Sequence, residues 1–294
     1  MKVAIIGAGN VGAMVASRVV DSGLADVALI DIAPGLAKGK ALDISDSRPI
    51  TGSSSKIEGS EDLKDMRGAG IVVVTAGLAR KPGMSRDDLI RKNSEIIKDV
   101  SLNIKKHASL AIVIIVTNPL DAMSYLTMKT AAFKPERVIG MAGVLDSARF
   151  INMVSSGSAR MQSDRIFMMG SHGDTMVAIN RSVDLDDKTF KEASEKARNR
   201  GAEIVGHLKT GSAYFAPSAA VFSMLRAILK DENRTVCCSA YLDGEYGEKD
   251  VYIGVPVTLG SSGVIKIIEI ELTQQEKKAF KKSVRQIRDT IAKL

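Results

Sequence analysis

The sequence predicts an α/β protein, with a doubly wound parallel sheet in its first half and a mixed α+β arrangement in its second half. Short apolar runs alternate with helical patterns from the N-terminus to residue 117. A glycine-rich turn joins the first apolar run to the first helical pattern. After residue 164 the order changes to paired strands, two long helices and three further strands. Strands that alternate with helices favour a parallel sheet covered on both faces.

Each element of the first half has its own pattern. The strand runs are short, apolar and rich in β-branched residues, whereas the helical runs repeat apolar residues at helical spacing. The predicted strands are Lys2–Gly7, Asp26–Asp31, Ile71–Thr75 and Ala111–Thr117. The predicted helices are Asn10–Asp21, Gly35–Asp46 and Arg86–His107. Because crossovers between parallel strands are right-handed, this order predicts a doubly wound sheet that binds ligands at the carboxyl ends of its strands.

The second half predicts an α+β domain. Two strands flank a tight turn, two helices follow, and three strands form a meander before a C-terminal helix. The predicted strands are Arg165–Gly170, Thr175–Asn180, Val236–Leu242, Tyr252–Leu259 and Val264–Ile270, and the two helices are Asp187–Leu208 and Tyr214–Leu229. The boundary falls near residues 140–143, so we expect one domain at 1–143 and the other at 144–294. No low-complexity linker separates them, which indicates a tight interface.

The bulk composition is that of a soluble globular protein, with 294 residues of which 45% are hydrophobic and 26% charged. No apolar run reaches ~18 residues and no secretory signal is recognisable, so we expect no membrane association and a cytoplasmic location. The two cysteines, Cys237 and Cys238, are adjacent and lack metal-ligand spacing, so we expect reduced thiols and no metal. The net charge of +7 is concentrated on one face of the last helix, which indicates a solvated face and no nucleic-acid partner.

The glycine-rich turn at residues 7–12 has the context of a dinucleotide site. A strand precedes it, a helix follows, and Asp31 ends the second strand. Gly7 permits the tight turn, Gly9 lets the backbone approach a pyrophosphate, and Gly12 lets helix and strand come together. The helix N-terminus supplies amide donors to the phosphates. Asp31 is expected to accept hydrogen bonds from the adenosine ribose and to repel a 2′-phosphate.

Two further segments follow strands at the predicted ligand edge. Residues 78–86 hold three cations and a Pro-Gly pair, which favours a closing lid that carries arginines onto an anionic substrate. A solvated loop is the alternative. Asn118 follows the strand that ends at Thr117 and has two interpretations. It could bond the substrate or the nicotinamide ribose, or it could cap the helix that begins at Pro119. These two interpretations of Asn118 are compatible.

His172 is the most informative residue of the second half. The chain has only three histidines, and this one lies in a glycine-rich turn, Gly-Ser-His-Gly-Asp-Thr at 170–175. Such a turn indicates a histidine that is positioned for chemistry. Asp146 is a carboxylate that would orient it, and Arg149 lies three residues further on a predicted helix. An ordinary intrahelical ion pair is the alternative for Asp146 and Arg149.

Taken together, these segments resemble the lactate/malate dehydrogenase superfamily over nearly the whole chain. Five motifs occur in the order that the family has. They are GAGNVG at 7–12, TAGLARKPGMSR at 75–86, TNPLD at 117–121, LDSAR at 145–149 and GSHGDT at 170–175. The chain departs from the family at Ser171, where glutamate is common, and at residues 143–144, where an Asn-x pair is usual. The resemblance implies an N-terminal Rossmann domain and a C-terminal α+β catalytic domain.

The resemblance also assigns roles to single residues. His172 would be the proton donor and acceptor, with Asp146 as its partner, and Arg149 would bind the carboxylate common to all substrates. Arg86 would polarise the reacting carbonyl, and Arg80 would occupy the lid position that selects the substrate. The residues implied at the cofactor are Gly7, Gly9, Asn10, Val11, Gly12, Asp31, Asn93, Thr117 and Asn118.

The activity implied is that of an NAD-dependent malate dehydrogenase, which interconverts (S)-malate and oxaloacetate. Arginine at position 80 favours this activity, since lactate dehydrogenases typically carry glutamine there. The expected partners are a small dicarboxylic 2-hydroxy or 2-oxo acid and further copies of the chain, as a homo-oligomer of two or four. The alternatives are an L-lactate dehydrogenase or other 2-hydroxy acid dehydrogenase, and a non-catalytic dinucleotide-binding protein.

Overall fold

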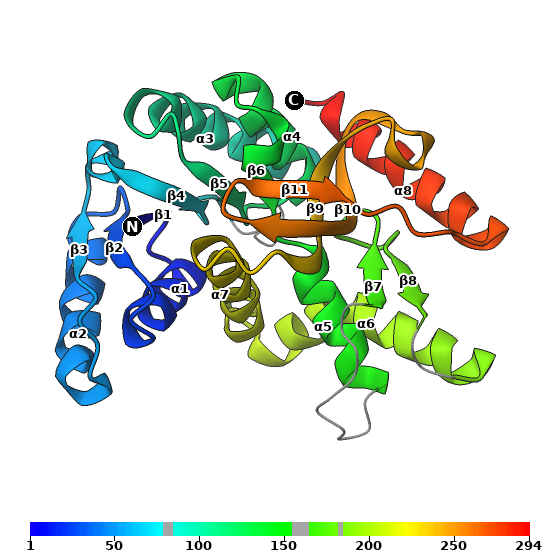
Figure 1. The fold of residues 1–294 in the computed structure, drawn as a ribbon, viewed down its shortest axis with the longest axis horizontal. Helices are drawn as coiled ribbons and strands as arrows, with labels where there is room; N and C mark the ends of the chain where they lie inside the picture. The colour runs from blue at the N-terminus through cyan, green and yellow to red at the C-terminus, as the bar shows by residue number, and fades with distance from the viewer. Residues whose placement is uncertain (79–84, 155–164, 182–184) are drawn as a thin grey trace.

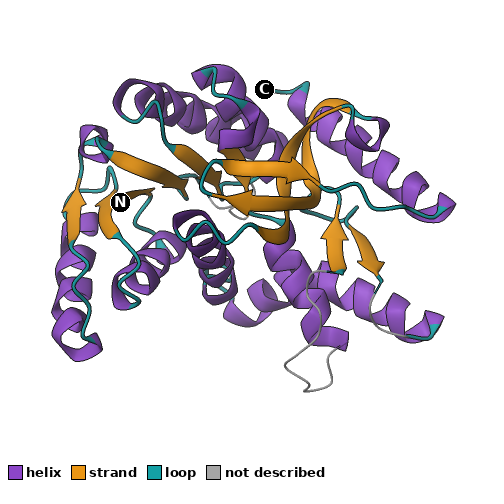
Figure 2. Cartoon of the chain, viewed as in Figure 1, coloured by secondary structure: helices purple, strands orange, loops and turns teal. Residues whose placement is uncertain are grey.

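The structure is a computed structural model that describes residues 1–78, 85–154, 165–181 and 185–294 (Figure 1). Within these residues one nine-stranded sheet forms the centre of the molecule, with helices on both faces (Figure 2). Its strand order is β11-β10-β9-β6-β5-β4-β1-β2-β3, and a separate pair, β7-β8, lies beside it. None of the helices in the described ranges is both long and apolar enough to cross a membrane.

The first six strands of the sheet are parallel, and four of them, β1, β2, β4 and β5, are the parallel strands that the sequence predicts. Each of β1, β4 and β5 has a hydrogen-bonded parallel strand on both sides. The strands are β1 (Lys2–Ile6), β2 (Asp26–Ile30), β3 (Ile57–Ser60), β4 (Ala69–Val74), β5 (Ile112–Ile115) and β6 (Val138–Gly140). The strand order reverses at β1, which pairs with both β2 and β4. Ligands bind at the carboxyl ends of the strands at such a reversal.

The helices of the first half cover both faces. They are α1 (Asn10–Asp21), α2 (Leu36–Thr51), α3 (Arg86–His107) and α4 (Leu120–Ala131). Because successive strand residues point to opposite faces, neighbouring residues of β1 enter different cores. Ile5 lies in the core that holds Val15 of α1, whereas Ile6 lies with Ile97 of α3 and Met123 of α4. The alternation makes the strands apolar throughout, which is why the sequence marks them as buried.

The second half adds three antiparallel strands to the same sheet. Its elements are α5 (Gly143–Val154), β7 (Ile166–Met169), β8 (Val177–Asn180), α6 (Asp187–Leu208), α7 (Phe215–Leu229), β9 (Arg234–Asp243), β10 (Lys249–Gly260), β11 (Gly263–Ile267) and α8 (Gln274–Ile291). The join is between β6 and β9, where Gly140 pairs with Ser239. The predicted meander is therefore confirmed as strands, yet it extends the central sheet. The domain division at residue 143 stays a prediction.

Three local differences from the sequence-based expectations have simple causes. The strands β3 and β6 were not predicted, because they contain only four and three residues and show no readable period. The helix α2 continues through Pro49 to Thr51, beyond the expected end at Asp46. Its last turns carry few apolar residues, so the helical period is absent there although the backbone remains helical.

The join between the two halves depends on a glycine. A side-chain carbon at Gly140 would lie 2.6 Å from Leu120 Cδ2, 2.7 Å from Ser239 Cβ and 2.8 Å from Ser124 Oγ. These distances are too short for any real contact. Gly140 therefore lets β9 and α4 approach β6 at the same point.

We expect Gly140→Ala to lower the free energy of unfolding by roughly 1–3 kcal/mol, since overfilling a close-packed site forces backbone shifts. Gly39→Ala is the matched control. Gly39 lies inside α2, with no atom within 4 Å of the position of an added carbon, so alanine there should raise stability by roughly 0.5–1 kcal/mol. Urea unfolding of both variants measures the difference. Equal stability of the two variants would contradict the role of Gly140.

Candidate active site

The glycine turn between β1 and α1 has the geometry of an anion-binding loop. Gly7 has a φ of +103°, which favours glycine, and a side chain at Gly12 would collide with the Gly7 carbonyl oxygen. Gly9 has no atom of the described residues within 4 Å of an added carbon, so this part of the turn is open to a ligand. Gly9 is also the cap residue of α1 and has no side chain that could bond the first amide groups of the helix. These open amides and the helix dipole suit a pyrophosphate.

Asp31 lies at the edge of this turn, as the sequence predicts. Its Oδ2 accepts the Ala8 N–H at 2.6 Å and its Oδ1 accepts the Ala33 N–H at 2.9 Å. Both bonds hold the carboxylate at the carboxyl end of β2, where ribose hydroxyls are expected. Lys40 of α2 donates to the Ala8 carbonyl oxygen at 2.7 Å, so a cation also contacts the turn. Sequence reasoning missed Lys40, because nothing along the chain relates this helix position to the turn.

His172 and Asp146 form a direct pair. Nδ1 of His172 lies 2.7 Å from Oδ2 of Asp146, whose side chain is only 3% exposed. The negative charge of Asp146 raises the pKa of His172, whereas burial lowers it, and the net direction is upward. The imidazolium form is therefore favoured in this site. The sequence separates these residues widely, and the structure brings them into contact as predicted.

The same carboxylate also holds Arg149. Nη1 of Arg149 lies 3.4 Å from Oδ1 of Asp146, one helical turn away on α5. Burial lowers the pKa of Arg149, Asp146 raises it, and the nearby Arg200 lowers it. Asp146 is thus shared between His172 and Arg149. The alternative of an ordinary intrahelical ion pair does not account for its contact with His172. Because Arg149 and Arg200 both carry a positive charge, the space next to Arg149 favours an anion.

Arg86 is the first residue of α3, at the helix start that the sequence predicts. Ser85 and Asp88 form a capping box there, which stabilises this helix start directly after the segment 79–84. Arg86 and His172 line one small cavity of about 30 Å³, together with Asp121. The cavity places the guanidinium-bearing Arg86 near the imidazole. Arg80 belongs to the segment 79–84 and lies outside the described residues.

Asn93 is buried and ties together the ends of two strands. Its Oδ1 accepts the Leu78 N–H at 2.8 Å, and its Nδ2 donates to the Asn118 carbonyl oxygen at 2.7 Å. Nδ2 also donates to the Leu78 carbonyl oxygen at 3.2 Å. Both the oxygen and the nitrogen of the side-chain amide are therefore bonded to backbone groups. Asn93 thus holds the loops after β4 and β5 in place at the edge of the sheet where ligands are expected. Its role as a direct cofactor contact stays a prediction.

Thr117 and Asn118 lie in the loop that follows the neighbouring strand, β5. The Thr117 hydroxyl donates to the Ala76 carbonyl oxygen at 2.6 Å, which joins the loops after β4 and β5. The helix-cap interpretation of Asn118 is wrong, since α4 begins at Leu120 with Pro119 at the cap position and no side-chain cap bond. The Asn118 side chain is exposed, which leaves it available to a ligand.

The chain belongs to the lactate/malate dehydrogenase family. The family model for the NAD binding domain of lactate/malate dehydrogenases matches residues 1–140. The model for the alpha/beta C-terminal domain of the same family matches residues 143–294. Residues 1–140 are thus an NAD-binding domain, and the cofactor of the family is the one that the glycine turn and Asp31 fit.

Individual members of the family show the likeness over full length. A malate dehydrogenase of Methanosarcina mazei is 43% identical over 304 aligned positions, which cover 100% of this chain and 99% of the relative. The structure of a malate dehydrogenase from Picrophilus torridus has a TM-score of 0.94 and 38% identity, with 99% and 96% of the two chains covered. A lactate dehydrogenase from Cryptosporidium parvum, complexed with lactic acid and nicotinamide adenine dinucleotide, has a TM-score of 0.93 and 36% identity, with the same coverage.

Proposed function

We propose that the chain is an NAD-dependent malate dehydrogenase that interconverts (S)-malate and oxaloacetate. The observation that carries the proposal is the pair of His172 with the buried Asp146, with Arg149 on the same carboxylate and Arg86 lining the same cavity as His172. An acid/base group beside two arginines suits a substrate that has a carboxylate next to a reacting carbonyl. The full-length identity of 43% to a malate dehydrogenase supports this choice.

Substrate binding rests on Arg149. A guanidinium grips a carboxylate with two parallel hydrogen bonds, which sets both the position and the orientation of the substrate. Asp146 holds one nitrogen of Arg149 at 3.4 Å, and the side chain is only 12% exposed. Little side-chain freedom is then lost on binding. Asn118, exposed at the end of β5, would bond the substrate or the nicotinamide ribose.

Proton transfer rests on His172. In reduction, the imidazolium gives its proton from Nε2 to the carbonyl oxygen, because Nδ1 faces Asp146. NADH, held at the glycine turn and Asp31, would supply the hydride. The raised pKa of His172 keeps it protonated at higher pH than a free histidine, which favours this direction. Arg86 would stabilise the negative charge that grows on the oxygen. In oxidation, neutral His172 accepts the hydroxyl proton.

Substrate choice would rest on Arg80, which lies in the segment 79–84 outside the described residues. The solved relatives include both malate and lactate dehydrogenases at similar identity, so the fold alone does not select the substrate. An arginine on the lid would pair with the second carboxylate of oxaloacetate. With pyruvate, closure would bury an unpaired guanidinium, which is costly. An L-lactate dehydrogenase is the second candidate.

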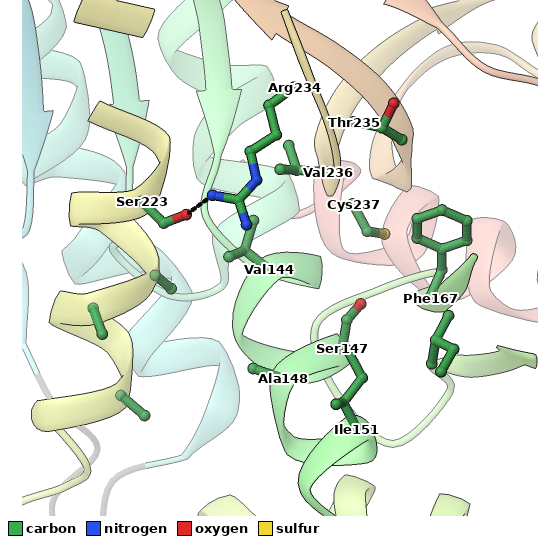
Figure 3. Close-up of a pocket in the computed structure, with 14 residues that line it drawn as sticks. Val144, Ser147, Ala148, Ile151, Phe167, Ser223, Arg234, Thr235, Val236 and Cys237 are labelled. Atoms are coloured by element: carbon green, nitrogen blue, oxygen red, sulfur yellow. Dashed lines mark hydrogen bonds between the residues drawn. The ribbon is translucent and has the colours of Figure 1, made fainter. Parts of the chain in front are cut away.

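We also propose that the chain forms a homo-oligomer through an apolar groove. The groove lies between α5 and α7 and has a volume of about 290 Å³ (Figure 3). It is lined by Val144 and Ile151 of α5 and by the start of β9. Two large apolar side chains of α2, Leu42 and Ile50, are 69% and 88% exposed. A second copy of the chain would cover both surfaces, which an isolated chain leaves in water.

The first prediction of the proposal concerns His172. We expect His172→Asn to lower the turnover of oxaloacetate by ~10²–10⁴-fold, the usual contribution of a positioned acid/base group. NADH binding, measured by fluorescence, should persist. The converse control is Asp31→Ser, which should weaken NADH binding by roughly ten-fold or more, through the lost charged hydrogen bonds to ribose. If the His172 variant keeps a tenth of normal turnover, the assignment of His172 fails.

The second prediction concerns substrate choice. Removing one partner of a buried charge pair costs ~2–5 kcal/mol, or roughly 30- to 5,000-fold. Arg80→Gln should reduce kcat/KM for oxaloacetate by this factor and raise that for pyruvate. Lys81→Gln, one residue further along the lid, is the matched control and should retain the oxaloacetate preference. If only the Lys81 variant loses the preference, the selecting residue is Lys81.

The third prediction concerns assembly. Light scattering should give two or four times the mass of one chain. Ala219→Arg places a charge in the groove, on α7, and should produce a monomer. Leu102→Arg is the control, because Leu102 is 53% exposed on α3, away from the groove, and its variant should keep the native mass. An unchanged mass for the Ala219 variant would show that the copies meet elsewhere.

A further inference from the structure

Asp121 is a buried carboxylate for which the family resemblance assigned no role. It is the second residue of α4 and is 5% exposed. Its Oδ2 accepts the backbone N–H of His172 at 3.0 Å, and its Oδ1 accepts the hydroxyl of Ser239 at 2.7 Å. One carboxylate therefore joins three segments that are distant in the sequence: the start of α4, the histidine turn and strand β9.

We propose that Asp121 is a positioning residue that fixes the backbone of His172 and adds a second negative charge to the surroundings of its imidazole. The inference rests on the proposed function of His172 and deepens it. Asp146 contacts the ring itself, whereas Asp121 acts through the backbone and through its charge. The histidine is thus held from two sides by carboxylates on two different helices, α4 and α5.

The charge of Asp121 and that of His172 influence each other. Burial raises the pKa of Asp121 and the bonds from Ser239 and His172 lower it, so that the net pKa is about 6. Ionised Asp121 in turn raises the pKa of His172, in the same direction as Asp146. Arg149 opposes both carboxylates by lowering the pKa of His172, and Arg86 lines the same cavity. Above a pH of about 6, Asp121 is mostly ionised and favours the imidazolium.

Asparagine separates the charge from the geometry. In Asp121→Asn the side-chain oxygen still accepts the His172 N–H. The amide nitrogen donates to Ser239, whose hydroxyl oxygen then acts as the acceptor. Both hydrogen bonds are kept, and only the negative charge is lost. A purely structural role of Asp121 would leave the titration of His172 unchanged in this variant.

The experiment is an NMR titration of the imidazole carbons in the intact protein. The chain has three histidines, so His107 and His207 serve as internal controls. In Asp121→Asn we expect the pKa of His172 to fall by about 1 to 2 pH units, the effect of one charge at roughly 6–10 Å and an effective dielectric constant of about 20. Asp146→Asn, which alters the direct contact, should lower it further. An unchanged pKa in a folded Asp121→Asn variant would overturn the proposal.

Kinetics separates this proposal from the proposed function. The decline of kcat/KM for oxaloacetate reduction at high pH should move to lower pH by the same interval in Asp121→Asn. If the imidazole shifts and activity does not follow, His172 is not the acid and the proposed function fails, while the positioning by Asp121 stands.

A second variant covers the case in which Asp121→Asn does not fold. Ser239→Ala removes one donor to Asp121 and should raise the pKa of that carboxyl group. The pKa of His172 should then fall, as in Asp121→Asn, but by a smaller amount. An unchanged pKa of His172 in Ser239→Ala would overturn the proposal.

Discussion

The single pairing of β6 with β9 determines where the catalytic groups lie. At this pairing Gly140 faces Ser239, and the antiparallel strands of the second half become part of the parallel sheet of the first half. The next strand, β10, exchanges two backbone hydrogen bonds with the histidine turn, between Gly170 and Gly254, at 2.8 and 3.0 Å. The turn is thereby held beside the ends of the parallel strands, where doubly wound sheets bind their ligands.

The second constraint is electrostatic. Charged groups that leave water need partners, since an unpaired buried charge costs several kcal/mol. Asp146 meets this need by contacting His172 and Arg149 at once, and Asp121 meets it with a hydroxyl and a backbone amide. The carboxylates stabilise the imidazolium and leave further donors of Arg149 available to a substrate anion. Stability and chemistry therefore depend on the same contacts.

The C-terminal helix supports the histidine turn from behind. Ser283 of α8 accepts the backbone N–H of Ser171 at 2.6 Å, and Thr175 donates its hydroxyl to Gln286 at 2.7 Å. The Ser171 hydroxyl lies 2.8 Å from that of Thr175. The short side chain at position 171, where the family commonly has glutamate, thus fits a buried hydroxyl network. This network explains how the departure from the family pattern is accommodated.

The sequence by itself determined the local parts of this protein. The glycine turn, the start of α3 at Arg86 and the apolar strands are encoded by short-range patterns, and so they were predicted closely. The pairing of His172 with Asp146 was also expected, first from the residues themselves and then from the family resemblance, and the structure shows the contact. The tertiary structure alone decided that the last strands extend the central sheet, that Lys40 contacts the Ala8 carbonyl oxygen and that Asp121 bonds the His172 backbone. A periodic pattern shows which residues are buried, but it does not show what they are buried against. Strand pairing and contacts between distant residues depend on which surfaces meet when the chain folds, so only the tertiary structure could decide them.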